Sequence, residues 1–166
     1  MIEPRVYAHL VTATARLGLE DCRLAQSELV DGLQGPQWRI RIFTVLALLR
    51  ASMHAVKKVD AVTEPMKSAN VTVWSERNTD PIFKDFIDED RNLLLKQYQL
   101  RAGQNVTVNM GPTPRSEITY TMNDGPFEGQ DPRELIDRAI TWISDYLDEV
   151  DRRTRAGEES VAGEPD

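Results

Sequence analysis

The sequence predicts a mainly all-α, single-domain protein: a bundle of four to five helices with a small β-hairpin inserted near residues 105–122. Apolar residues recur at helical spacing over most of the chain, strand-like alternation is confined to one short stretch, and glycine and proline gather around that stretch. At 166 residues the chain is long enough to bury one core. We expect residues 1–154 to form this domain. Residues 155–166 are acidic, lack apolar periodicity and are expected to be a disordered tail.

The strongest helical pattern lies in residues 37–62. Apolar side chains at intervals of three and four residues place one face toward a core: Ile42, Leu46, Leu49, Met53 and Val56. We expect this segment to be the central helix. Before it, residues 4–17 suit either a helix or a strand, and we favour a helix. Gly18 is expected to separate that segment from a short helix over residues 19–33.

Two further helices are predicted in the second half of the chain. Pro81 and Pro132 each follow a side chain that can cap a helix, and each fits the first helical position. Helices are therefore expected over residues 81–100 and 132–153. The intervening residues 63–80 hold only a small apolar island, so we expect a loop there with at most one helical turn.

Residues 101–130 have a different composition, with frequent glycine and proline. Two short runs alternate between apolar or β-branched and polar residues, Val106–Val108 and Ile118–Met122, and the segment GPTPRS lies between them. This pattern predicts the β-hairpin. A lone two-stranded ribbon is marginally stable in water, so its base should pack on the helices.

The composition limits the classes of function. The net charge of -7 disfavours a dedicated nucleic-acid binder, although it leaves room for a local basic patch. With one cysteine, Cys22, and two histidines, the chain has too few such ligands for a typical zinc site, and we expect no metal and no cofactor. The first residues lack the apolar run of a signal peptide, and no segment is apolar enough to span a membrane, so a cytoplasmic protein is expected.

An acidic cluster that contains one arginine interrupts the apolar face of the helix expected over residues 81–100. The cluster is residues 88–92, DEDRN. Its Arg91 points partly toward the core, and a buried cation must be neutralised. We therefore expect Arg91 to be mostly buried and paired with Asp88, or else with Asp85 or an acid from another helix. The cluster is either a structural ion-pair network or part of a functional site.

The run from Arg91 to Lys96, RNLLLK, resembles the motif of HEPN domains, the higher eukaryotes and prokaryotes nucleotide-binding family. It is also similar to uncharacterised bacterial all-α proteins with a comparable helix. HEPN domains are all-α, and many are metal-independent ribonucleases that use an arginine, a polar residue after it and a histidine further along the helix. The resemblance implies that Arg91 takes the place of the arginine and Asn92 that of the polar residue.

The chain departs from this motif at the histidine. Lys96 stands where the shortest form of the motif has it, and an unperturbed lysine is a poor general base at neutral pH. The resemblance therefore implies the scaffold more than the activity. The first expected function is a non-catalytic interaction or accessory protein that works through a protein partner. The alternative is a metal-independent ribonuclease or a nucleotide-binding protein that uses Arg91 and His54.

A basic stripe follows the central helix: Arg50, His54, Lys57 and Lys58. If this helix lies beside Arg91, His54 could supply the proton-transfer group that the motif lacks. Otherwise the stripe pairs with acids of the neighbouring helix. His54 thus joins Arg91 and Asn92 as a catalytic candidate.

Trp74 lies in the predicted loop, where it either folds back on the core or stays exposed to stack a base or anchor a partner. The candidate ligand-binding residues are Arg50, Lys57, Lys96 and Trp74. Four helices should also leave apolar surface uncovered on residues 37–62 and 132–153, so we expect a two-fold homodimer, and HEPN-like domains often pair.

Overall fold

The computed structural model describes residues 10–113 and 115–162, and it confirms a mainly helical bundle with one small β-hairpin. Two π-helical segments, η2 and η3, continue or precede an α-helix. In chain order the elements are α1 (Ala13–Ser27), α2 (Gly35–Ala55), η2 (Val56–Asp60), α3 (Glu64–Arg77), η3 (Ile82–Asp88), α4 (Glu89–Gln97), β1 (Ala102–Asn109), β2 (Arg115–Met122) and α5 (Pro132–Ala162).

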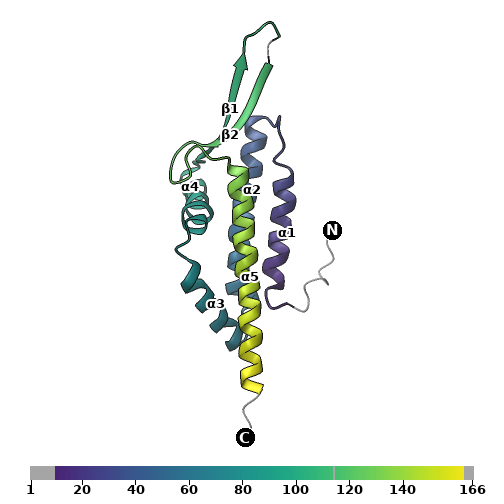
Figure 1. Ribbon diagram of the computed structural model, residues 1–166, viewed down its shortest axis with the longest axis vertical. Helices are drawn as coiled ribbons and strands as arrows, with labels where there is room; N and C mark the ends of the chain where they lie inside the picture. Colours follow the sequence, from purple (N-terminus) through teal and green to yellow (C-terminus); the bar gives the residue numbers. More distant parts are fainter. Residues whose placement is uncertain (1–9, 114, 163–166) are drawn as a thin grey trace.

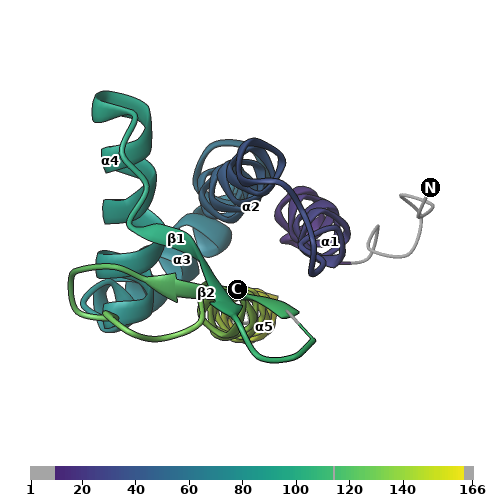
Figure 2. The same ribbon diagram turned by 90° about the horizontal axis from the view of Figure 1, so that it is seen from above.

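The molecule is elongated, with α5 running along the bundle (Figure 1). The hairpin projects from one end and the C-terminal part of α5 from the other. Seen from above, α1 and α2 lie side by side, while α4 extends away from α5 (Figure 2). β1 and β2 pair antiparallel from Ala102 opposite Met122 to Asn109 opposite Arg115. The hairpin predicted near residues 105–122 is therefore correct in type and place.

The predicted loop over residues 63–80 is wrong, because most of it forms α3. Thr63 precedes the helix, and its side chain accepts a hydrogen bond from the backbone N–H of Met66. Pro65 occupies the first turn, where its missing N–H has no consequence. The helix buries a narrow strip that includes Ala69 and Val73. A strip this narrow gives too weak a periodic signal to predict a helix, although the capping residue Thr63 and the proline Pro65 can both be recognised in the sequence.

The N-terminal helix also differs from the prediction. α1 runs through Gly18, the residue expected to break it, and ends at Ser27 instead of residue 33. A Cβ atom added at Gly18 would lie 2.8 Å from the Ser52 hydroxyl, so glycine permits α1 and α2 to approach closely here. The helix favoured over residues 4–17 lies partly outside the described residues, and its described part is helical from Ala13.

The disorder expected for residues 155–166 is also wrong as far as the chain is described, because α5 continues to Ala162. Thr154 is buried, and Arg153 pairs with Glu76 of α3 at 2.8 Å, so the helix is still held where the tail was expected to begin. Residues 156–160 are mostly exposed. They extend a helix whose preceding turns are already formed, and such extension is far less costly than nucleation. Residues 163–166 lie outside the described part.

The core is built around one face of α5, which carries a stripe of apolar residues. Its buried side chains are Leu135, Ile136, Ala139, Ile140, Trp142, Ile143, Tyr146, Leu147 and Val150. Trp142 stacks on both Phe83 and Tyr146, and Trp74 meets Phe83 edge to face. Since the bundle itself covers this face, the reason given for a homodimer through residues 132–153 does not hold.

The buried ion pair of this protein belongs to Arg101, not to Arg91. The Arg101 side chain is 12% exposed and pairs with Asp90, which is 3% exposed. Its guanidinium also donates to the backbone carbonyl of Asp85, and Asp124 lies 3.8 Å away. Gly125 has a φ of 80°, and a Cβ there would collide with the guanidinium. Arg101 therefore ties η3 and α4 to the loop that follows the hairpin.

Arg91, predicted to be mostly buried and paired with a carboxylate, is only half-buried. Its Nη1 donates to the side-chain oxygen of Asn92 at 2.9 Å. Within the described residues it has no ion pair, because Asp88 pairs with Arg50 at 3.0 Å and Asp90 with Arg101. Arg91 is not fully buried because α4 extends away from α5, and α5 therefore does not pack over this part of α4 (Figure 2).

The pair also sets a pH dependence. Burial raises the pKa of Asp90 from 3.8 to about 6, and the Arg101 guanidinium opposes part of that rise. Asp90 thus binds its proton more tightly in the folded protein than in the unfolded chain. Its contribution to stability is fully present below about pH 4 and is lost as the pH rises through about 6.

We expect Arg101→Met to lower the free energy of unfolding by about 3–5 kcal/mol at neutral pH, because it leaves Asp90 buried without its cation. The loss should be smaller at pH 5, where Asp90 takes up a proton. Arg91→Met is the matched control and should cost about 1 kcal/mol or less. Urea unfolding of both variants at the two pH values measures these differences, and equal losses for the two arginines would contradict the assignment.

Candidate functional site

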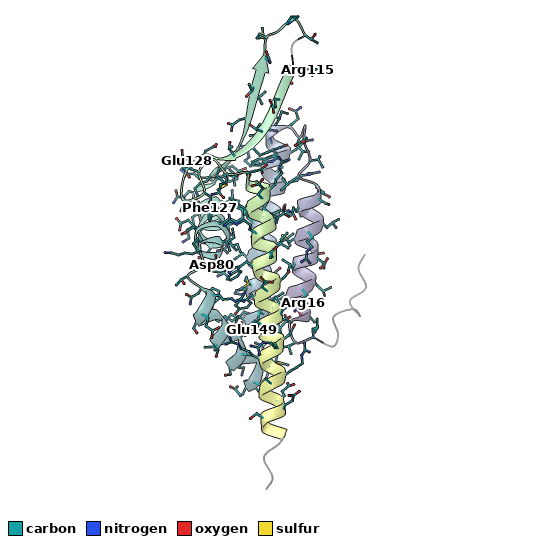
Figure 3. All side chains as sticks on the ribbon, viewed as in Figure 1. Arg16, Asp80, Arg115, Phe127, Glu128 and Glu149 are labelled. Carbon is teal, nitrogen blue, oxygen red and sulfur yellow. The ribbon has the colours of Figure 1, made fainter. Side chains whose placement is uncertain are left out.

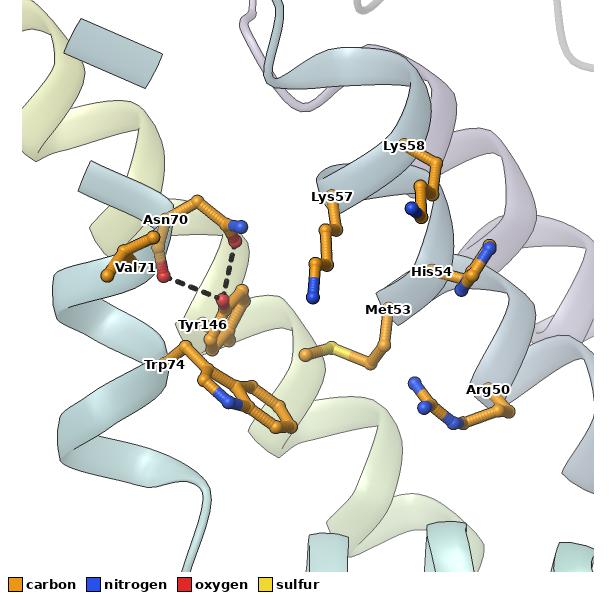
Figure 4. Close-up of a pocket in the computed structure, with 9 residues that line it drawn as sticks. All are labelled: Arg50, Met53, His54, Lys57, Lys58, Asn70, Val71, Trp74 and Tyr146. Atoms are coloured by element: carbon orange, nitrogen blue, oxygen red, sulfur yellow. Dashed lines mark hydrogen bonds between the residues drawn. The ribbon is translucent and has the colours of Figure 1, made fainter. Parts of the chain in front are cut away.

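A cleft of about 270 Å³ opens between the C-terminal part of α2 with η2 on one side and α3 on the other (Figure 4). Tyr146 of α5 forms its floor. Residues of both walls line it: Arg50, Met53, His54, Lys57, Lys58, Asn70, Val71 and Trp74. We refer to it as the α2–α3 cleft.

One wall of the cleft is basic. Arg50 and His54 come from α2, and η2 contributes Lys57 and Lys58, so the stripe predicted from the sequence is present as a surface. In Figure 4 the Lys57 side chain extends into the space between the helices. None of the described residues that line the cleft is an acid. Although the whole chain carries a net charge of -7, the charged side chains among the described residues that line this cleft are all basic.

A π-helical segment supplies the two lysines. η2 adds a wide turn directly after α2, and it is anchored by Asp60, whose carboxylate accepts the backbone N–H groups of Thr14 and Ala15 at 3.1 and 2.9 Å. The carboxylate thereby caps the start of α1. The Asp60 side chain is buried, whereas the side chains of Lys57 and Lys58 are exposed. The acid at the end of η2 is therefore used inside the fold, and the lysines remain available.

The opposite wall carries two aromatic rings and a side-chain amide. The Tyr146 hydroxyl donates to the Asn70 side-chain oxygen at 2.6 Å, and it also lies 3.2 Å from the Asn70 backbone carbonyl. Burial raises the pKa of the Tyr146 phenol, so this hydroxyl keeps its proton and stays a donor. The amide nitrogen of Asn70 then turns toward the cleft, on the side of Lys57 (Figure 4). Trp74 adds a half-buried indole beside it.

Arg50 is held in place at the end of the cleft. Its guanidinium lies 5.7 Å from the centre of the Phe83 ring, and its Nε lies 3.0 Å from an Asp88 oxygen. The Nε–H is not aligned for a hydrogen bond, so the contact with Asp88 is an ion pair without a directed bond. Asp88 therefore neutralises part of the Arg50 charge but accepts no hydrogen bond from the Arg50 Nε–H group.

A second, more open recess of about 420 Å³ lies between α2 and α4. It contains Arg91 together with Arg50 and His54, and small or apolar residues complete its lining: Ala47, Ala51 and Leu95. Arg50 and His54 line both recesses, and the two openings share this part of α2. The arrangement required for His54 to act with Arg91, that their helices lie side by side, is therefore met.

The remaining sequence candidates have different positions. Asn92 lines neither recess; it accepts a hydrogen bond from Arg91 and lies 3.4 Å from an Asp88 oxygen. Lys96 is exposed and also lines neither recess. Trp74 lies on α3, not in a loop, with its ring packed on Phe83 and half-buried. It combines the two alternatives, since it covers the core and also borders the cleft.

Sequence reasoning missed Asn70 and Tyr146 as site residues. Tyr146 belongs to the apolar stripe of α5 and has no sequence signal beyond a core position. Asn70 lies in a segment expected to be a loop. Once α3 is recognised as a helix, Asn70 and Trp74 are four residues apart and share a face, so the amide could have been found.

Comparisons with known proteins give no match: no family model, no curated protein and no solved structure resembles the chain. The likeness to HEPN domains stays a prediction. Among the described residues no helix could cross a membrane, and no group of three or more histidine, cysteine or acidic side chains could hold a metal ion.

Proposed function

We propose that this protein binds a small phosphate-bearing ligand of the nucleotide class in the α2–α3 cleft. The observation that carries the proposal is the combination of basic side chains on one wall with an indole and an amide on the other, and no acid among the described residues that line the space. This replaces the accessory-protein function as the first expectation, because an interaction module does not need such a cleft.

The chemistry of the two walls supports this ligand class. Lysine and arginine donate charge-assisted hydrogen bonds to phosphate oxygens, and these are about twice as strong as neutral ones. A base stacked on an aromatic ring contributes roughly 1–3 kcal/mol, and the Asn70 amide can donate to a base edge or a sugar oxygen. The volume of about 270 Å³ is just below the usual range of ligand pockets, so the cleft suits a small ligand rather than a long chain.

Lys57→Gln should weaken the binding of AMP and of pyrophosphate about 10-fold, because it removes one cation from the cleft. Asp88→Asn should strengthen both, since Asp88 competes for the Arg50 charge. Lys96→Gln is the matched control: it removes the same charge at an exposed position that lines neither recess. Isothermal titration calorimetry at low salt measures all three. Equal affinities for Lys57→Gln and Lys96→Gln would contradict the location of the site.

Trp74→Leu separates base recognition from phosphate recognition. The variant should weaken AMP about 10-fold, in line with the loss of one stacking contact, and leave pyrophosphate unchanged. Because Trp74 also packs on Phe83, thermal unfolding must first show that the variant is folded at the titration temperature. A folded variant that binds both ligands like the wild type would reject the nucleotide class and leave only a phosphate site.

A second candidate function, metal-independent cleavage of RNA, is favoured by one observation: Arg91 and His54 border the same recess together with Arg50. In such a reaction His54 would take the proton of a ribose 2′-hydroxyl as it attacks the adjacent phosphorus, and the arginines would stabilise the added negative charge. The bond from phosphorus to the 5′-oxygen of the next nucleotide breaks, this oxygen leaves with a proton from solvent, and a 2′,3′-cyclic phosphate remains. His54 is exposed and no carboxylate orients it within the described residues, which is why this function is second.

If this candidate is correct, labelled single-stranded RNA should be cleaved in the presence of a metal chelator, and both His54→Ala and Arg91→Ala should reduce the rate at least 100-fold. Lys96→Gln should have wild-type activity. Absence of cleavage, or cleavage that survives both substitutions, would reject it and leave the binding function in place.

A further inference from the structure

The outer half of the hairpin lies beyond the bundle. At its base Tyr120 stacks on Trp38 at 5.2 Å and donates to the Val30 carbonyl, while Gln104 donates to the carbonyl of Leu33. From Asn105 outward every described residue of β1 is exposed. Figure 3 shows the side chains of this half, as far as Arg115, clear of the helices. A two-stranded ribbon without cover on either face is marginally stable by itself.

Each strand of this two-stranded ribbon has one free edge, and β1 lacks the features that normally protect an exposed strand. Natural edge strands carry charged side chains, prolines or bulges that prevent pairing with another chain. β1 reads AGQNVTVN and contains no charged residue and no proline, in a chain that is 28% charged. β2, in contrast, carries Arg115 and Glu117 in its outer half. The unprotected edge is therefore β1.

The outer part of β1 is also self-complementary. Residues 105–109 read Asn-Val-Thr-Val-Asn, which is the same in both directions around Thr107. Antiparallel pairing with an identical strand reverses its direction, so a two-fold axis through Thr107 would place Val106 opposite Val108 and Asn105 opposite Asn109 of the other copy. β-Branched pairs of this kind favour sheet formation, and no like charges meet.

We propose that the β1 edge pairs with the β1 edge of a second copy of this chain, forming a four-stranded antiparallel sheet around a two-fold axis at Thr107. Because the axis is perpendicular to the sheet, the same face of both hairpins lies on one side. Val106, Val108 and Ile118 belong to one face, and Val106 is opposite Ile118 within the hairpin. Each copy thus contributes one small apolar strip, in which Val106 is 59% and Val108 56% exposed. The pairing joins the two strips into one.

This arrangement differs from the homodimer expected from the sequence, which used the helices. It also separates the two bundles, since each bundle lies beyond the outer end of the other hairpin. The strands that meet are five residues long, about 17 Å. Such an edge buries far less than the roughly 800 Å² per partner of a stable interface, so the dimer forms in the micromolar to millimolar range.

Charge placed at the paired positions tests the register. Asn105→Glu with Asn109→Glu puts like charges opposite each other across the axis, while Asn105→Lys with Asn109→Glu puts opposite charges there. Within one chain residue 109 faces Arg115 and residue 105 faces Thr119, so both variants keep a compatible hairpin. Sedimentation equilibrium of the full chain should give twice 18.8 kDa at high concentration for the wild type. The Glu/Glu variant should be monomeric, and the Lys/Glu variant should dimerise at least 10-fold more tightly.

Asn105→Lys with Asn109→Lys and Arg115→Glu should also be monomeric. This variant again sets like charges across the axis, keeps opposite charges at positions 109 and 115 within the hairpin, and leaves the net charge at -7, which excludes a general charge effect. A wild type that stays monomeric to millimolar concentration would overturn the proposal. Dimers of equal strength in the Glu/Glu and Lys/Glu variants would overturn it too, because the interface would then lie elsewhere.

A cross-link tests the axis directly. Directly opposed Cα atoms in antiparallel strands are about 4.5–5.5 Å apart, within the range of a disulfide. Thr107→Cys should therefore give a covalent dimer on mild oxidation, whereas Thr119→Cys on β2, which is also exposed, should not. The native Cys22 is buried and does not interfere. Equal cross-linking at the two positions would contradict the two-fold axis at Thr107.

Discussion

The burial of one face of α5 is the constraint on which the rest of the structure depends. α1, α2, α3, η3 and β2 all contact this helix. Its aromatic side chains determine how closely the neighbouring helices approach, because Trp142 stacks on both Phe83 and Tyr146. Smaller residues would leave the space between these helices unfilled. α2 and α3 both rest on α5, and the α2–α3 cleft is the space left between them, with Tyr146 as its floor. The cleft is thus a consequence of the packing.

The sequence was sufficient for features with strong local signals. The helix over residues 37–62, the proline-initiated helices and the hairpin all depend on periodicity or turn residues, and all were found. α3 was missed because it buries too narrow a strip to give a clear period. The buried arginine was assigned to Arg91 instead of Arg101 for a different reason: which arginine is covered depends on the direction of α4, and no local pattern encodes that direction.

The candidate site was predicted in part. Arg50, His54, Lys57 and Trp74 were named from chemistry alone, and all four line the α2–α3 cleft. Lys96 was named because of its place in a motif, and it lies outside both recesses. Asn70 could not be paired with Tyr146 from sequence, since their hydrogen bond joins residues 76 positions apart. Residue type identified the cations, but only the packing of three helices could bring the amide and the indole to face them.

The central claim is that this cleft, whose charged lining residues are basic in an otherwise acidic chain, binds phosphate and a base together. NMR spectra of the protein, labelled with nitrogen-15 and titrated with AMP, test it most directly, because Asn70 and Trp74 carry side-chain N–H groups of their own. The account predicts saturable shifts of the Asn70 side-chain amide and the Trp74 indole N–H, while the Trp38 indole, on the far side at the hairpin base, stays unchanged. Shifts confined to residues outside the cleft, or no shifts at millimolar AMP, would contradict it.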